Sequence, residues 1–240
     1  DGSYGFFMID VREVEFDGEA VTVVGDAIGE IPAGGDPETD VRTVWSAWDA
    51  FTMRATPEGD SHFYPFGIDW THCNGLAYEP EVGKYLVSMY ELGSITQVDA
   101  ATGATDWILG GEDGTLAIPE GEGFIVAHSP EPVAGGLRLF NNRAPEETPP
   151  HSRVLEYQVD EAAGSASLVE SIALNSEYFS FILGDSNALP DEHLLVSWGS
   201  LGMLTELNAE RDVVWQGELP LGQVVGLTSD VQVPGQPPAP

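Results

Sequence analysis

Apolar and polar residues alternate in many short runs along the chain, as in residues 6–11 and 20–24. A period of two places alternate side chains on opposite faces of a strand, so these runs predict β-strands. Helical spacing of apolar residues is nowhere sustained beyond about 12 residues without a Gly or Pro. Further runs of the strand type span residues 85–89, 94–98, 137–140, 154–159, 194–198, 203–207 and 213–215. Turn-forming residues separate them, which predicts an all-β fold: a sandwich, a barrel or a propeller.

An internal repeat favours the propeller among these folds. Leu86–Ser88 recurs as Leu195–Ser197, and Leu92–Gly93 recurs in the same register as Leu201–Gly202. Looser copies of the same pattern occupy residues 137–172 and 20–48. Four-stranded units repeated about every 40–60 residues are typical of β-propeller blades. A small sheet cannot bury both of its faces by itself, whereas neighbouring blades cover each other's faces. The sequence therefore predicts an all-β propeller of four-stranded blades.

The number of units bears on whether the ring closes. The chain holds about four or five units, and open propellers expose strand edges, so a closed ring needs more chain. We therefore expect the ring to be incomplete in this chain. Trp107 and Trp215 stand at the ends of two units and are expected to fill the space between neighbouring blades. The propeller domain is assigned to residues 1–233, and the Pro-rich residues 234–240 are expected to form a flexible tail.

The composition is strongly acidic, since 40 Asp and Glu residues against 8 Lys and Arg give a formal net charge of −32. Such a surface repels DNA, RNA and anionic membranes, so nucleic acid is excluded as a partner. No run approaches about 18 uninterrupted apolar residues, which argues against a membrane-spanning helix. We interpret the charge as an acidic coat that serves solubility or adaptation to a salty medium. A bound anion would need a local pocket where the few Arg and His residues converge.

Cys73 is the only cysteine, which excludes a disulfide within the chain and a Cys-based zinc site. This is consistent with a cytosolic protein or with a large secreted one. Acidic turns such as residues 36–40 lack the spacing of a calcium loop, and neither a metal nor a cofactor is predicted. The chain begins at Asp1 without a Met or a signal peptide, and is expected to be a processed chain or a fragment.

The segments that lead into the units are the places where a propeller positions ligand-binding residues. His72 and His128 lie in two such segments, which belong to successive units. Equivalent positions in successive blades would direct both imidazoles into one axial pocket. The alternative for each is a hydrogen-bonded histidine at a strand end. The remaining histidines stand in polar, turn-like sequence and are expected at the surface: His62, His151 and His193.

The residues around the first of these histidines carry a family resemblance. Asp69–Gly75 reads Asp-Trp-Thr-His-Cys-Asn-Gly and resembles the Asp-Trp-Thr-His-x-Asn motif of bacterial arylsulfate sulfotransferases. Trp107–Gly111 is similar to the Trp-x-Leu-Gly-Gly segment of that family, and Leu139–Arg143 and Ser152–Tyr157 resemble two further segments. The matching motifs keep their order over residues 43–220, and this order makes the resemblance specific.

The resemblance implies a six-bladed propeller, periplasmic or secreted, that moves a sulfuryl group from an aryl sulfate to a phenol without a nucleotide donor. It implies a covalent sulfohistidine, with further histidines and an arginine that hold the sulfate oxygens. His72 and His128 match the binding histidines. Arg143 matches the arginine best, with Arg153 as the second choice, and Asn74 of the motif is included among the substrate-binding residues. The partner expected from this is a small aryl sulfate or phenol.

The sequence departs from the family where the nucleophilic histidine is expected. The loop after residues 194–198 reads Gly199-Ser-Leu-Gly-Met203 and contains no histidine. Ser200 does not readily replace an imidazole, because a hydroxyl nucleophile needs an adjacent base. Two hypotheses follow. One is a sulfotransferase-like protein with an axial anion pocket, and the other is a non-catalytic extracellular propeller that serves as a binding or structural module. The oligomeric state stays open.

Overall fold

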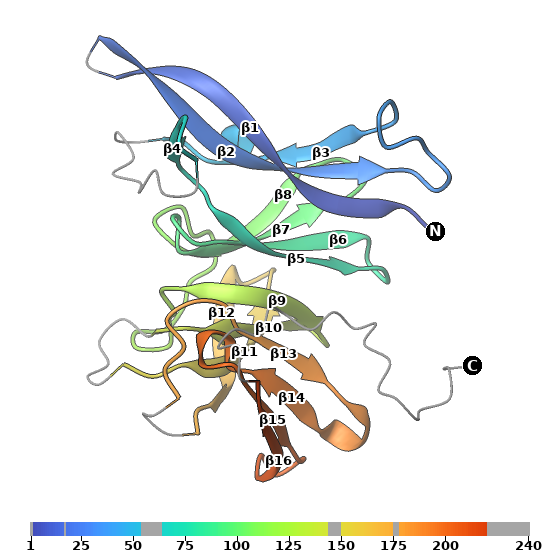
Figure 1. Cartoon of the computed structure of the whole chain (residues 1–240), viewed down its shortest axis with the longest axis vertical. Helices are drawn as coiled ribbons and strands as arrows, with labels where there is room; N and C mark the ends of the chain where they lie inside the picture. Colours follow the sequence, from blue (N-terminus) through green and yellow to red (C-terminus); the bar gives the residue numbers. More distant parts are fainter. Residues whose placement is uncertain (1, 17, 54–63, 144–149, 175–177, 220–240) are drawn as a thin grey trace.

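The computed structural model describes residues 2–16, 18–53, 64–143, 150–174 and 178–219. These residues form four four-stranded sheets that follow one another along the chain, here called blades A to D (Figure 1). Blade A contains β1 (Tyr4–Phe16), β2 (Glu19–Ile31), β3 (Arg42–Ser46) and β4 (Ile68–Asp69). Blade B contains β5 (Cys73–Glu79), β6 (Lys84–Met89), β7 (Ser94–Asp99) and β8 (Thr105–Gly110). The expected tail, residues 234–240, lies outside the described residues.

The other two blades repeat the pattern of blade B. Blade C contains β9 (Ala127–Val133), β10 (Gly136–Asn141), β11 (Arg153–Asp160) and β12 (Ser165–Ile172). Blade D contains β13 (Asp185–Ala188), β14 (Leu194–Ser197), β15 (Met203–Leu207) and β16 (Val213–Glu218). In blades B to D each strand pairs antiparallel with the next, as in a meander. The remaining elements are three short helices: α1 (Ala47–Ala50), η1 (Pro190–Glu192) and η2 (Gly199–Leu201).

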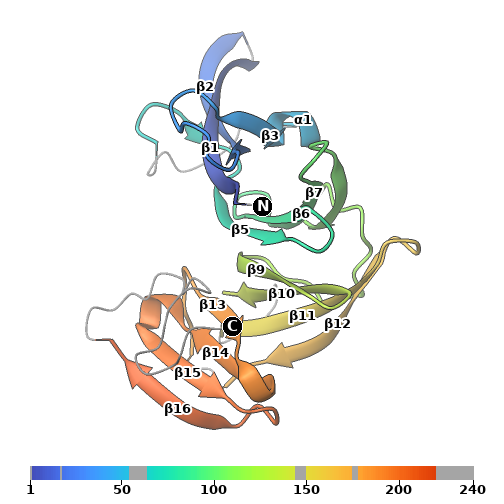
Figure 2. The same cartoon turned by 90° about the vertical axis from the view of Figure 1, so that its right-hand side faces the viewer.

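The blades are arranged along an arc, with β5, β9 and β13 as the first strand of each blade on its inner side (Figure 2). The structure thus confirms an all-β propeller built of four-stranded blades. The sequence copies at Leu86–Ser88 and Leu195–Ser197 lie on β6 and β14, the second strands of blades B and D. One step of that sequence repeat therefore spans two blades, and blade C contains the looser copy between them.

Blade A departs from the other three. Its hairpin is long, with all 13 residues of β1 paired to β2 in one uninterrupted register. Its fourth strand, β4, pairs with β2 in parallel and leads directly to β5 of the next blade. Strand β3 ends at Ser46, where the Ser46 hydroxyl accepts a hydrogen bond from the Trp48 N–H and begins the short helix α1.

Apolar side chains gather between neighbouring blades. One cluster joins blades B and C and includes Leu86, Leu109, Leu137 and Leu155, each at most 1% exposed. Trp107 lies in this cluster and is 5% exposed, as the sequence predicts for a residue that fills the space between blades. Burial of this surface, at about 25 cal/mol per Å², is the main force that holds one blade to the next.

Tryptophan side chains also supply polar links across these interfaces. The Trp45 indole of blade A donates a 3.0 Å hydrogen bond to the Thr105 hydroxyl of blade B. The Trp107 indole of blade B donates to the Glu161 carboxylate of blade C at 3.2 Å. Trp215 of the last described blade is 49% exposed. The expectation that it fills an inter-blade space is therefore not met within the described residues, where no blade follows β16.

The two tryptophans at matching repeat positions give a first prediction. Trp107→Ala should lower the free energy of unfolding by about 3–5 kcal/mol, because it leaves a cavity between blades B and C. Trp215→Ala is the matched control and should lower it by about 0.5 kcal/mol or less, since half of that side chain is already in water. Urea unfolding followed by fluorescence and circular dichroism measures both changes. Equal losses would show that the two side chains are packed alike.

Candidate functional site

The innermost strands of blades B, C and D begin at the same end of the channel that they line. Cys73, Ala127 and Asp185 each pair with the last residue of the following strand, so these three positions are equivalent. His72 precedes the first of them and His128 follows the second. The two histidines therefore lie at the same end of adjacent inner strands, but their positions differ by two residues relative to the strand pairing.

His72 is held by a tight turn between β4 and β5. Its backbone has a φ of 47°, in the left-handed region that few non-glycine residues adopt. Asp69 accepts hydrogen bonds from both the His72 N–H, at 3.1 Å, and Nδ1, at 2.6 Å. The bond to Asp69 raises the pKa of His72 despite partial burial, since a carboxylate partner favours the imidazolium. The edge of the Tyr90 ring packs on the imidazole, with ring centroids 5.5 Å apart.

Further carboxyl groups surround this turn. Asp26 is buried on β2 and accepts hydrogen bonds from the Thr71 hydroxyl, at 2.6 Å, and the Cys73 N–H, at 2.8 Å. Burial and the nearby Asp69 raise the pKa of Asp26, and the same two causes raise that of Glu91. Burial also raises the pKa of the Cys73 thiol well above its usual range, so this cysteine is a poor thiolate. The acidic surroundings favour the charged form of His72.

His128 occupies the opposite kind of environment. It is 7% exposed on β9, and its Nδ1 lies 2.7 Å from Oδ1 of Asn142, a neutral partner. Burial is the main cause that lowers the pKa of His128 to about 4; the hydrogen bond with Asn142 opposes this shift, and the charge of His72 contributes to it. The two histidines therefore interact electrostatically, and their partners shift their pKa values in opposite directions.

Asn142 is itself fixed by its surroundings. Its side-chain NH₂ group donates to the carbonyl oxygens of Ser180 and Leu183, both at 2.7 Å, and its backbone N–H donates to Val126 at 2.9 Å. With the NH₂ group occupied by two carbonyls, the amide oxygen is the atom that faces His128. An amide oxygen only accepts hydrogen bonds, so Nδ1 of His128 carries the proton.

Asn74 is engaged in contacts between blades B and C. Its side-chain NH₂ donates to the Ala127 carbonyl at 3.0 Å, and its amide oxygen accepts from the Ser88 hydroxyl at 2.5 Å. It follows Cys73 as His128 follows Ala127, so it stands at the position in blade B equivalent to that histidine. These contacts hold β9 against blade B directly beside His128.

Arg143 follows β10 and is exposed. Its carbonyl accepts a hydrogen bond from the Ile125 N–H at 3.3 Å, so its backbone lies beside the segment that leads into His128. Arg153 lies one strand farther from the channel, on β11, where it pairs with Asn141 of β10. Of the two arginines, Arg143 has its backbone nearer to the strand that carries His128.

Other Lys and Arg side chains of the described residues form ion pairs with carboxylates. None of these pairs includes His72 or His128. These pairs are Arg12–Asp10, Arg42–Glu30, Lys84–Asp99, Arg138–Glu156 and Arg211–Glu170. Within the described part of the chain, no carboxylate forms an ion pair with Arg143. This side chain is therefore a cation that the acidic surface has not neutralised there.

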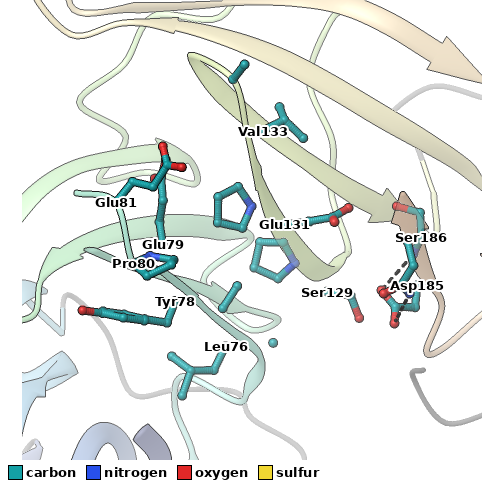
Figure 3. A pocket seen from close by; sticks show the side chains of 16 residues that line it. Leu76, Tyr78, Glu79, Pro80, Glu81, Ser129, Glu131, Val133, Asp185 and Ser186 are labelled. Carbon is teal, nitrogen blue, oxygen red and sulfur yellow. Dashed lines mark hydrogen bonds between the residues drawn. The ribbon is translucent and has the colours of Figure 1, made fainter. Parts of the chain in front are cut away.

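A cavity of about 810 Å³ lies along β5, β9 and β13 (Figure 3), and its lining includes none of the expected site residues His72, Asn74, His128, Arg143 and Arg153. Its lining includes Glu79, Glu81, Glu131 and Asp185, which make it acidic. Figure 3 shows the Glu131 carboxylate directed toward Asp185. Burial and the charge of Asp185 raise the pKa of Glu131, although Arg138 opposes this shift. Carboxylates therefore line the cavity at both ends, since Asp185 stands level with Ala127 at the histidine end and Glu79 ends β5 at the other.

The loop expected to carry a nucleophile holds Ser200 in η2. The Ser200 hydroxyl lies 3.1 Å from the Ser180 hydroxyl and accepts a bond from the Phe181 N–H at 3.2 Å. Neither contact is a base that would activate the hydroxyl. Among the described residues no group of three or more His, Cys, Asp or Glu side chains is placed to hold a metal ion. No helix in the described part of the chain is long and apolar enough to cross a membrane.

The remaining histidines take no part in this end of the channel. His193 is half-buried, with Nδ1 2.7 Å from the Glu206 carboxylate, and His151 is also half-buried. His62 lies outside the described residues. The sequence analysis did not single out Asp69 or Asn142, the two partners that set the states of the site histidines. Asp69 and His72 are three residues apart, and this spacing is a signal in the sequence for a local pair. Asn142 is 14 residues from His128, so no local spacing indicates that contact.

The contrasting partners of the two histidines lead to a prediction for their titration. In the wild type the pKa of His72 should lie above its ordinary value of about 6.5, and that of His128 near 4. Asp69→Asn should lower the pKa of His72 and leave Asn142 bonded to His128. Glu206→Gln, which removes the partner of His193, is the matched control. Histidine proton NMR across the pH range measures each value, and an unchanged His72 in Asp69→Asn would contradict the assignment.

Stability should follow from the same shifts. The raised pKa of His72 contributes stability that is fully present below about pH 6.5 and is lost as pH rises through its folded value. The lowered pKa of His128 acts in the other direction, because stability present above about pH 6.5 is lost as pH falls toward 4. Urea unfolding at a series of pH values measures the free energy of unfolding. In Asp69→Asn the contribution from the raised pKa of His72 should disappear. An identical pH dependence in wild type and variant would contradict it.

Comparison with solved structures finds matches of low sequence identity. A protein of unknown function from Bacteroides caccae is 16% identical with a TM-score of 0.44, over 83% of this chain and 57% of that one. A luciferin-regenerating enzyme is 13% identical with a TM-score of 0.47, over 90% and 64%. Virginiamycin B lyase from Staphylococcus aureus is 10% identical with a TM-score of 0.42, over 90% and 61%. The chain thus spans less than two thirds of the length of each.

No match was found among curated proteins. A protein-family comparison gives a match to Arylsulfotransferase (ASST) over residues 5–218. The matched region contains all four blades and both histidines of the channel end. The chain therefore belongs to the arylsulfotransferase (ASST) family.

Proposed function

We propose that this chain binds a sulfate ester or a similar anion at the histidine end of its axial channel, with sulfuryl transfer from an aryl sulfate to a phenol as the reaction. We place its action in the periplasm or outside the cell, as the family resemblance implies. The contact that carries the proposal is the double hydrogen bond from His72 to Asp69, because it favours the imidazolium form of His72 at the start of β5.

The charges near the channel support an anion at this end rather than farther along it. Asp69 raises the pKa of His72 and so favours its charged form, and Arg143 is exposed beside the segment that leads to His128. The cavity contains Glu79 and Glu81 at the other end of β5, where they would repel a sulfate, while Asp185 is the lining carboxylate at the histidine end. An aryl sulfate bound here would direct its sulfate group to the histidine end and extend its ring along the channel.

These side chains have the properties that sulfuryl transfer requires. Negative charge accumulates on the oxygens around sulfur as the bond to the leaving group breaks, and cationic donors stabilise that charge. A protonated imidazole and a planar guanidinium form short, charge-assisted hydrogen bonds with such oxygens. His72 and Arg143 would hold the donor sulfate in this way, with Arg153 in second place for the arginine.

A second candidate function is a non-catalytic extracellular propeller that acts as a binding or structural module. It is favoured by the loop at residues 199–203, which has no histidine, and by the absence of a base among the hydrogen-bond partners of Ser200 in the described part of the chain. Transfer through a covalent sulfohistidine on that loop is not available to this chain. Turnover of an aryl sulfate in the presence of a phenol, abolished by one histidine substitution, would exclude the module as the sole role.

Binding of 4-nitrophenyl sulfate tests the anion site directly. His72→Gln and Arg143→Gln should each weaken binding about tenfold or more, because each removes a hydrogen bond to a charged group worth about 1.5–3 kcal/mol. His193→Gln is the control, since that histidine lies away from the channel end and should bind as the wild type does. Isothermal titration calorimetry gives the affinities. Undetectable binding by the wild type, or equal affinities in all four proteins, would refute the proposal.

A further inference from the structure

The cavity of about 810 Å³ along β5, β9 and β13 carries only negative charge on the part of its wall that the structure describes. Its charged lining residues are all carboxylates: Glu79, Glu81, Glu131 and Asp185. Apolar side chains line it as well, among them Leu76, Pro80, Pro132 and Val133. A cavity with this lining suits a ligand that combines positive charge with an aliphatic body.

The carboxylates stand at separate places along the cavity. Asp185 begins β13 at the histidine end, whereas Glu79 ends β5 at the other end and Glu81 follows in the next turn. The strand from Cys73 to Glu79 covers about 20 Å, at about 3.3 Å per residue. Among the described residues no three His, Cys, Asp or Glu side chains gather closely enough to hold one metal ion. Separated carboxylates instead match charged groups that are joined by a chain.

Glu131 and Asp185 bring two carboxylates together from blades C and D. Figure 3 shows the Glu131 carboxylate directed toward Asp185, and burial together with the charge of Asp185 raises the pKa of Glu131. Arg138 donates to Glu131 at 2.9 Å, but it also donates to Glu156 at 3.0 Å. One guanidinium is thus shared by two carboxylates and Asp185 adds a third, so this corner of the cavity keeps a negative charge.

Ser186 adds an unused hydrogen-bonding group at the same corner. It lines the cavity next to Asp185 and is 1% exposed, yet its hydroxyl has no hydrogen-bond partner among the described residues. Figure 3 shows its side chain on the side of β13 that faces Glu131. A buried hydroxyl without a partner loses the hydrogen bonds that water would supply. A donor group on a ligand in the cavity would restore one.

We propose that this cavity binds an aliphatic polyamine. One primary ammonium group donates to Glu131, Asp185 and the Ser186 hydroxyl, because its three N–H donors match three acceptors. A second ammonium group lies near Glu79 and Glu81, and the alkyl chain between them packs on the apolar wall. The cavity lining includes none of the residues of the proposed anion site, so this inference goes beyond the proposed function.

Isothermal titration calorimetry with spermine tests the site. In about 0.15 M NaCl, where charges are screened beyond about 8 Å, the wild type should bind spermine at one saturable site. Butylamine keeps one ammonium group and an alkyl chain but lacks the second charge. It should bind about tenfold more weakly or less, because it loses the hydrogen bonds of a charged group.

Two carboxylate variants locate the bound cation. Glu131→Gln should weaken spermine binding about tenfold or more, since it removes a charged acceptor from a half-buried corner. Glu81→Gln should weaken it about two- to fivefold and serves as the second variant if Glu131→Gln unfolds, which circular dichroism reports. Glu210→Gln is the matched control, because this carboxylate is exposed and lies outside the cavity lining, and it should bind as the wild type does.

The serine hydroxyl can be tested without any change in charge. Ser186→Ala should weaken spermine binding about two- to tenfold, the usual range for one hydrogen bond. Ser197→Ala is the matched control. Ser197 is also 1% exposed with an unpartnered hydroxyl, but it lies outside the cavity lining, so its loss should leave the affinity unchanged.

The contrary results are distinct. Equal affinities in Glu131→Gln, Glu81→Gln and Glu210→Gln, or binding that does not saturate, would reveal diffuse attraction to the acidic surface and overturn the proposal. Butylamine that binds as tightly as spermine would overturn it too, as would calcium chloride that binds saturably and is lost in Glu131→Gln. Absence of 4-nitrophenyl sulfate binding would remove the proposed function and leave this inference standing, because the two sites share no residue.

Discussion

The packing of one blade against the next is the constraint on which the rest of this structure depends. A four-stranded sheet buries one of its faces only if a neighbouring sheet covers it. Between blades B and C this cover is supplied by a leucine-rich cluster around Trp107. Because that cluster fixes β5 beside β9, two histidines that are far apart in the chain meet at one end of the channel. The chemistry of the site thus depends on apolar contacts that are remote from it.

Polar contacts give the two histidines different roles after packing has brought them together. A carboxylate, Asp69, binds His72 and favours its charged form, whereas an amide, Asn142, binds His128 in a buried place and leaves it neutral. Identical side chains in adjacent blades therefore differ in charge and in hydrogen-bonding capacity. Paired titratable groups with opposed environments are the arrangement that acid–base chemistry uses.

The acidic composition makes the distribution of the few cations informative. Arg12, Arg42, Lys84, Arg138 and Arg211 all form ion pairs with carboxylates. A protein of net charge −32 that binds an anion must concentrate positive charge locally, since the long-range field repels the ligand. At the histidine end Asp69 raises the pKa of His72, and Arg143 is exposed beside the segment that leads to His128, so these are the groups on which the proposed anion site depends.

The sequence by itself determined the strands, their repeated pattern and the presence of both histidines at blade beginnings, because strand periodicity and turn residues are local properties. It also predicted the burial of Trp107, and the family to which the chain belongs. It did not reveal that the positions of the two histidines differ by two residues relative to the strand pairing. The pairing of β5 and of β9 with the next strand contains register shifts, and the alternation of apolar and polar residues in the sequence does not indicate where such shifts occur. The protonated nitrogen of His128 was decided only by the tertiary structure. Ser180 and Leu183, which orient Asn142, come from a later segment of the chain and reach it only when blades C and D pack together.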